Sequence, residues 1–179
     1  MDDQEQSYKR AEELYRLAHL FMGDRELSMN LVLETIHSQN GSEGLFALGM
    51  HASLRKQFIA RVLARFRGKL SLSATRLVSE QTEEELPSAG GSFDPSSTAA
   101  HIEHVLLAID IFPRCALLLT VFERFSLDDA SILISSHPQM VLKGRIAGLR
   151  GLTRRLAKMG NCHPSSQIAL TECEVRHAY

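Results

Sequence analysis

The sequence predicts an all-α protein built from two small helical domains that are joined by a flexible linker. Apolar residues recur with the 3.6-residue spacing of helices over most of the chain, and no segment alternates apolar and polar residues as a strand does. A polar segment, 79–99, separates the two helical parts. The chain has 179 residues, of which 44% are hydrophobic, so a packed core is feasible.

The first predicted domain covers residues 1–78 and contains three helices. The first helix ends near Gly23, and Asp24 can cap the second, which ends in the polar run 37–42. The third helix is expected over 43–68. The positions that carry the helical periodicity are Leu14, Leu17, Ala18, Phe21, Leu27, Leu31, Val32, Thr35, Ile36, Phe46, Ala47, Met50, Leu54, Phe58, Val62 and Phe66.

The segment 79–99 is the predicted linker. It is rich in Ser, Gly, Pro and Glu, and it is much longer than the ~4–6 residues that usually connect helices in a compact domain. The second domain is expected over 100–159, with Pro113 at the start of a helix. Residues 160–179 are expected to form a disordered tail.

A short helix, a polar turn and a long basic helix are expected between 125 and 158. Ser126 is a suitable N-cap, and Ser135 stands in the turn where a glycine is common. Pro138 fits the first position of the second helix. Many proteins use such a helix pair to place the second helix in the DNA major groove. The residues expected to face inward are Ala130, Leu133, Ile134, Val141, Leu142, Ile146, Leu149, Leu152 and Leu156.

Charge is unevenly distributed, although the whole chain carries a net charge of only −1. No acidic residue occurs in 44–79 or in 130–171. These basic segments are either two contacts with a polyanion or solvated helix faces. Their cations are Arg55, Lys56, Arg61, Arg65, Arg67, Lys69, Arg76, Lys143, Arg145, Arg150, Arg154, Arg155 and Lys158.

The cysteines and apolar segments indicate a soluble cytoplasmic protein. The three cysteines are odd in number, which argues against a disulfide framework. The acidic N-terminus is unlike a signal peptide, and Asp110, Pro113 and Arg114 interrupt the longest apolar run. We therefore expect a reduced protein without membrane insertion.

Motifs of catalysis are absent, since the sequence has no G-x-S-x-G, Walker loop or H-E-x-x-H. We therefore expect no enzymatic activity and no cofactor. The tail has residue types that could bind zinc, but it lacks a C-x-x-C pair, so a disordered tail without metal is expected. His101 and His104 have helical spacing and could bind a metal, although surface histidines are the plainer interpretation. The tail residues concerned are Cys162, His163, Cys173 and His177.

In this order, the motifs resemble those of bacterial RNA polymerase sigma factors of the extracytoplasmic-function type, over about residues 8–158. The second-domain pattern of that family, P-x-x-R, an apolar run, L-S-x-E-E-A, a turn and V-K-x-R-L, is similar to Pro113–Arg114, 116–121, 126–130 and 142–146. The first-domain pattern, y-R-L-A, G-D and A-E-D-L-V-Q-E, is similar to 14–18, 23–25 and 30–34.

The resemblance implies core RNA polymerase and promoter DNA as partners, with an anti-sigma factor as a possible further partner. In the family, the helix that here carries Asn30, Leu31 and Glu34 docks on the polymerase. In a recognition helix over 138–157, Gln139 suits adenine and Lys143 suits guanine. Phosphates would be held by Arg145, Arg150, Arg154 and Arg155. Two interpretations stay open for five further cations, which either contact the promoter or form a solvated helix face: Arg55, Lys56, Arg61, Arg65 and Arg67.

Departures from the family pattern lie in the first domain. Met29 and Asn30 replace its acidic pair, Leu33 replaces its glutamine, and the chain has no Trp for promoter melting. Phenylalanines at 46, 58 and 66 could stack on bases or belong to the core. Two functions therefore stay open: a transcription initiation factor, or a sigma-like regulator that binds anti-sigma or polymerase partners without initiating.

Overall fold

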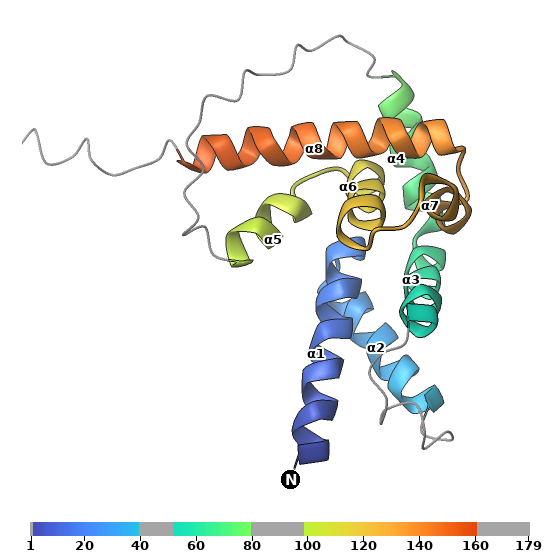
Figure 1. The fold of residues 1–179 in the computed structure, drawn as a ribbon, viewed down its shortest axis with the longest axis vertical. Coiled ribbons are helices and arrows are strands. Elements are labelled where there is room, and N and C mark those ends of the chain that lie inside the picture. Colours follow the sequence, from blue (N-terminus) through green and yellow to red (C-terminus); the bar gives the residue numbers. More distant parts are fainter. Residues whose placement is uncertain (1, 40–51, 80–98, 161–179) are drawn as a thin grey trace, which may run out of the picture.

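The computed structural model describes residues 2–39, 52–79 and 99–160, and every regular element in these ranges is a helix (Figure 1). The predicted all-α class is confirmed. No described helix combines the length and the apolar character needed to cross a membrane. The elements are α1 (Asp2–Met22), α2 (Arg25–Gln39), α3 (Ala52–Arg65), α4 (Arg67–Ser79), α5 (Ala99–Leu107), α6 (Ile111–Leu117), the π-helical η1 (Leu118–Phe122), α7 (Leu127–Ile134) and α8 (Pro138–Gly160).

The α1–α2 corner forms where the sequence predicts it. Gly23 has a φ of +70°, a left-handed conformation that residues with a Cβ rarely adopt. The Asp24 carboxylate accepts a hydrogen bond from the Leu27 N–H at 3.0 Å and caps α2. Phe21 is fully buried at the end of α1, and beyond this corner α2 packs against α1.

The expected third helix, 43–68, is wrong at its C-terminal end. The helix is interrupted at Phe66, and a separate helix, α4, extends from Arg67 to Ser79. Phe66 is buried, and its N–H reaches the Leu63 carbonyl at 3.4 Å, so the helix tightens and redirects there. Gly68 falls in the first turn of α4 and does not end it. Three of the expected positions, Phe46, Ala47 and Met50, lie outside the described residues.

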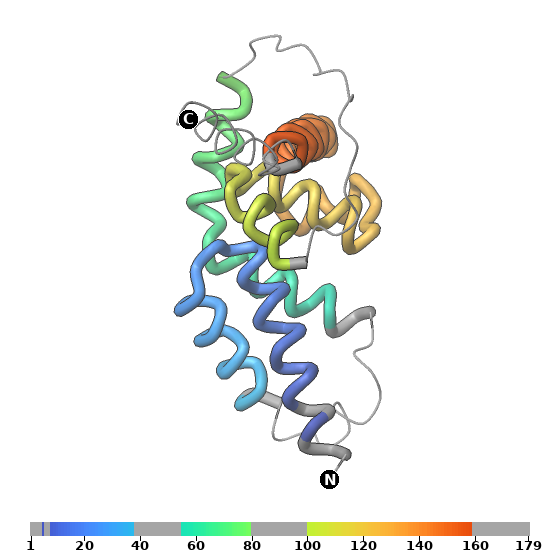
Figure 2. The backbone as a smooth tube through the Cα atoms, turned by 90° about the vertical axis from the view of Figure 1, so that its left-hand side faces the viewer, coloured from blue at the N-terminus to red at the C-terminus, as the bar shows by residue number. Residues whose placement is uncertain are grey.

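A single hydrophobic core contains residues from both halves of the chain. Phe21 of α1, Val62 of α3, Leu70 of α4, Phe112 of α6 and Val141 of α8 are all buried in it. Figure 2 shows α1 to α4 running on from the region of α5 to α8 with no gap between two bodies. The division into two separate domains is therefore not confirmed; the predicted linker, except for its ends, lies outside the described residues.

Arg114, at 4% exposure, ties the two halves together by hydrogen bonds to backbone carbonyls. Its guanidinium donates to the carbonyls of Leu107 (2.8 Å), Ile109 (3.2 Å) and Phe21 (3.3 Å). Burial lowers the pKa of this guanidinium below its ordinary value. The neighbouring Cys115 is a free, fully buried thiol, and burial raises its pKa to about 12.

Glycines bring α8 close to α6. A Cβ at Gly144 would lie 2.8 Å from the ring of Phe112, and one at Gly148 would lie 2.6 Å from the Pro113 carbonyl oxygen. Ile146 and Leu149 do not face inward as expected, because they are 41% and 40% exposed. The helix packs through its small residues, which rotates these two apolar side chains out of the core.

Candidate nucleic-acid interface

The turn between α7 and α8 has the local structure that the sequence predicts. Ser126 caps α7, because its hydroxyl accepts a hydrogen bond from the Asp129 N–H at 3.0 Å and donates to the Asp129 carboxylate at 2.8 Å. Ser135 adopts the left-handed conformation (φ 57°, ψ 50°), and Pro138 is the first residue of α8. A short helix, a three-residue turn and a long helix therefore follow one another here; a helix-turn-helix that binds DNA stays a prediction.

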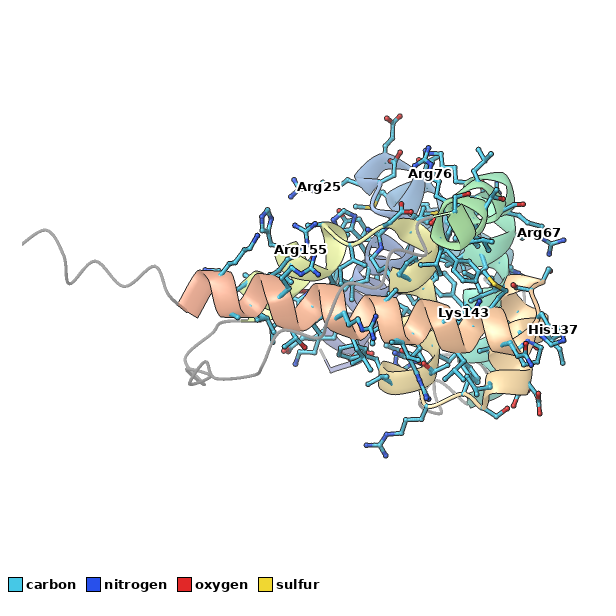
Figure 3. The ribbon with its side chains drawn as sticks, turned by 90° about the horizontal axis from the view of Figure 1, so that it is seen from above. Arg25, Arg67, Arg76, His137, Lys143 and Arg155 are labelled. Atoms are coloured by element: carbon cyan, nitrogen blue, oxygen red, sulfur yellow. The ribbon has the colours of Figure 1, made fainter. Side chains whose placement is uncertain are left out.

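Four of the predicted DNA contacts lie along one side of α8. They recur at intervals of four, seven and four residues, so the helical repeat aligns them, and all four are exposed: Gln139, Lys143, Arg150 and Arg154. Val141, Gly144 and Gly148 occupy the opposite, buried side. Figure 3 shows Lys143 at the surface of α8, seen from above. These four residues are called the outward stripe below.

Two other predicted contacts on α8 lie off the outward stripe. Arg145 is only partly exposed. Arg155 is exposed, but the helical repeat places it in line with Gly144, Gly148 and Gly151, beyond the part of that side which α6 covers. The predicted phosphate contacts thus divide into an aligned pair, Arg150 and Arg154, and two residues that point elsewhere.

Arg55 and Lys56 both pair with residues near α7, although their side chains remain 37% and 46% exposed. The Arg55 guanidinium donates two hydrogen bonds to the Glu123 carboxylate, at 2.6 and 2.7 Å. These bonds raise the pKa of Arg55 above its ordinary value, against the opposing effect of burial. The Lys56 ammonium lies 2.7 Å from Asp129 Oδ1 and 5.8 Å from the centre of the Phe125 ring. Basic residues of α3 therefore fasten α3 to the start of α7.

The other three predicted DNA contacts of the first half differ in their surroundings. Arg65 forms an ion pair with Glu34 of α2. Arg61 on α3 and Arg67 at the start of α4 are exposed, and neither forms an ion pair with any residue in the described ranges. The structure thus does not gather Arg61, Arg65 and Arg67 into one cluster with equal access to a partner.

Of the predicted polymerase contacts on α2, only Asn30 is exposed and without an ion pair. Leu31 is 5% exposed and packs in the core, and its assignment as a polymerase contact stays a prediction. Glu34 is exposed but engaged by Arg65. The outward surface of α2 instead presents Met29 and Leu33, which are 47% and 45% exposed.

Two of the three phenylalanines with a possible stacking role belong to the core. Phe58 and Phe66 are 4% and 6% exposed, which leaves no ring face for a base. Phe46 lies outside the described residues. His101 and His104 are exposed on α5, and no group of three or more metal-ligating side chains gathers within the described ranges. The Cys and His residues of the tail lie beyond those ranges.

Sequence reasoning missed the residues that hold the site in place. Glu123 accepts both bonds from Arg55 across 68 residues of sequence, and no local spacing signals such a pair. The contribution of Gly148 could have been suspected from three closely spaced glycines within one predicted helix, Gly144, Gly148 and Gly151. Comparison with protein-family models, with curated proteins and with solved structures finds no match to this chain.

Proposed function

We propose that this protein is a sigma-type transcription initiation factor that binds core RNA polymerase and reads promoter DNA with α8. The observation that carries the proposal is the outward stripe, an exposed row of one amide and three cations on a helix held by a capped turn. No acidic residue occurs between 130 and 171, so nothing within α8 opposes the approach of a phosphate backbone.

The order of residues along the outward stripe suits reading at one end and anchoring at the other. Gln139 and Lys143 occupy the first two turns of α8, the part of a recognition helix that reaches base edges. Gln can form a bidentate pair with adenine, and Lys can bond the acceptors of guanine. Arg150 and Arg154 follow further along and would bond phosphates, fixing the register of the helix on the duplex.

Polymerase docking in this proposal uses the outward surface of α2. Met29, Asn30 and Leu33 are exposed there and stand where the similar family carries two acids and a glutamine. Contact would then depend on apolar burial and one amide instead of carboxylates. A cytoplasmic location follows from this proposal, because polymerase and promoter DNA are found there.

A second candidate is a sigma-like regulator that binds an anti-sigma or polymerase partner without initiating. It is favoured by α2, where Leu31 is buried and Glu34 is paired with Arg65. Two of the three residues expected to contact polymerase are thus occupied within the chain. In this alternative, the exposed apolar residues of α2 bind another protein, and α8 has no role in promoter selection.

The test is reconstitution with core polymerase, followed by run-off transcription from a library of genomic fragments. Initiation predicts a complex with the core and transcripts that start at defined positions. Leu33→Arg should abolish the complex, whereas Tyr8→Arg, at a residue that is 71% exposed on α1, should leave it intact. Absence of a core complex, together with a tight complex with another protein, would replace the first candidate by the second.

A further inference from the structure

We infer that α4 and α8 form one continuous surface for duplex DNA, so that a single short duplex contacts both helices at once. This inference rests on the proposed function, because it takes α8 as the reading helix. It adds Lys69 and Arg76 of α4, which belong to the first basic segment but are not among the DNA contacts named from the resemblance. The two basic segments of the chain would then serve one DNA site instead of two separate ones.

The first argument is charge. Helices α4 and α8 contain nine Lys and Arg residues, three and six respectively, and no Asp or Glu. The cations of α4 also differ from those of α3 in how they are used. Arg55, Lys56 and Arg65 of α3 pair with carboxylates. In contrast, the α4 cations are exposed and form no ion pair with any described residue: Arg67, Lys69 and Arg76.

The second argument is the position of α4. It is anchored to the start of α6 by Ser73, whose buried hydroxyl donates to the Asp110 carboxylate at 2.6 Å and accepts from the Phe112 N–H at 2.9 Å. It also packs directly against α8. Lys69 and Arg76, seven residues apart, therefore share one exposed side of a helix that cannot shift freely relative to α8.

The pictures agree on this arrangement. In Figure 1, α4 crosses behind the half of α8 that begins at the α7 turn. Seen from above, α4 lies beside the half of α8 that carries Lys143, with Arg67 and Arg76 directed to different sides of α4 (Figure 3). Helix α4 thus lies beside α8, and the helical repeat places Lys69 and Arg76 on the side of α4 that is opposite Arg67.

Size and groove geometry favour duplex DNA over other polyanions. The 23 residues of α8 extend about 35 Å, close to one turn of B-DNA, or about 10 base pairs. A helix lying in the major groove brings the flanking phosphates toward whatever packs beside it, here α4. The deep, narrow major groove of duplex RNA would not admit α8.

The experiment measures how affinity for a duplex of about 15 base pairs depends on salt. Lys69→Ala/Arg76→Ala should lower the slope of log affinity against log salt by about two, since each lost phosphate contact removes about 0.9. Lys9→Ala/Arg16→Ala removes the same charge from exposed positions on α1 and should leave the slope unchanged. Lys143→Ala/Arg150→Ala should lower the slope by about one, because Arg150 is assigned to a phosphate and Lys143 to a base edge.

The outcomes separate this inference from the proposed function. An unchanged slope for the α4 double variant, with a reduced slope for the α8 double variant, overturns the inference and leaves the proposed function standing. Reduced slopes for both, without a polymerase complex, support the inference and refute initiation. Equal binding of a 15-base-pair RNA duplex with the same changes overturns the choice of DNA, and no binding of either duplex by the wild type overturns both proposals.

Discussion

At the scale of the residue, the orientation of α8 depends on two glycines, which have no Cβ and so allow close packing. Gly144 and Gly148 let α6 approach so closely that Ile146 and Leu149 turn outward, and this rotation determines which residues form the outward stripe. Arg114 acts in the opposite way, because its guanidinium fills a buried space and bonds three backbone carbonyls. Both kinds of contact are buried, and together they determine which side chains α8 presents at the surface.

Gly148→Ala should destabilise the protein by about 1–2 kcal/mol. The new Cβ would lie 2.6 Å from the Pro113 carbonyl oxygen and 3.0 Å from Leu117 Cβ, and a backbone carbonyl cannot move aside cheaply. Overpacking of this kind costs about 1–3 kcal/mol, offset in part by the better helix propensity of alanine. The free energy of unfolding in urea measures the change.

The matched control is Gly68→Ala in the first turn of α4, where nothing lies within 4 Å of the new Cβ. It should be neutral or should stabilise the protein by up to about 1 kcal/mol. Equal effects of the two substitutions would refute the close packing of α8 on α6.

The helical repeat explains why the orientation of some α8 side chains could be predicted and that of others could not. The alignment of Gln139, Lys143, Arg150 and Arg154 follows from the helical repeat alone, so the sequence sufficed for it. Ile146 was predicted to face inward because apolar periodicity places large apolar side chains in the core. That periodicity does not show where glycines allow two helices to pack closely. The partners of Arg55 and Arg65 depend on which helices meet, and that is a property of the whole fold.

At the scale of the element, α3 and α7 are joined by charge at a point that also caps a helix. Asp129 is bonded to the Lys56 ammonium, and its own N–H bonds the Ser126 hydroxyl that begins α7. The bond from Lys56 is the largest influence on the pKa of Asp129, followed by the bond from Ser126, and both lower it. The start of the helix pair is thus coupled to α3.

Acid should weaken this junction in a defined range. In the folded state, the pKa of Asp129 lies below its ordinary 3.8. The stabilisation is therefore complete above pH 3.8 and is lost as the pH falls through the lower pKa of the folded state. Unfolding in urea between about pH 5 and about pH 2 should show a smaller acid loss for Asp129→Asn than for the wild type.

Lys56→Met removes the principal cause of the shift and should flatten the acid profile in the same direction. An Asp129→Asn profile that parallels the wild type throughout would show that Asp129 does not couple to folding.

The boundaries of α7 and α8 were largely predictable, because Ser126 and Pro138 have unambiguous positions at helix starts. The α3–α4 break was not, because Phe66 ends α3 through its burial and has no helix-breaking character of its own.

At the scale of the whole molecule, the halves on either side of the predicted linker share one core. Segment composition at 79–99 indicates a connection, but it does not say whether the helices before and after it pack together. The apolar faces of both halves look alike in sequence whether they close on themselves or on each other. The shared core is what brings the basic α4 beside the basic α8.

The most direct test of α8 as a promoter-reading helix is selection of duplex sequences by the wild type, Lys143→Ala and Arg150→Ala. We predict a defined sequence for the wild type. Lys143→Ala should lose preference at one base pair, worth about 1–3 kcal/mol, whereas Arg150→Ala should keep the sequence and bind all duplexes more weakly. Selection of no defined sequence, or an identical preference and affinity for all three proteins, would contradict the assignment.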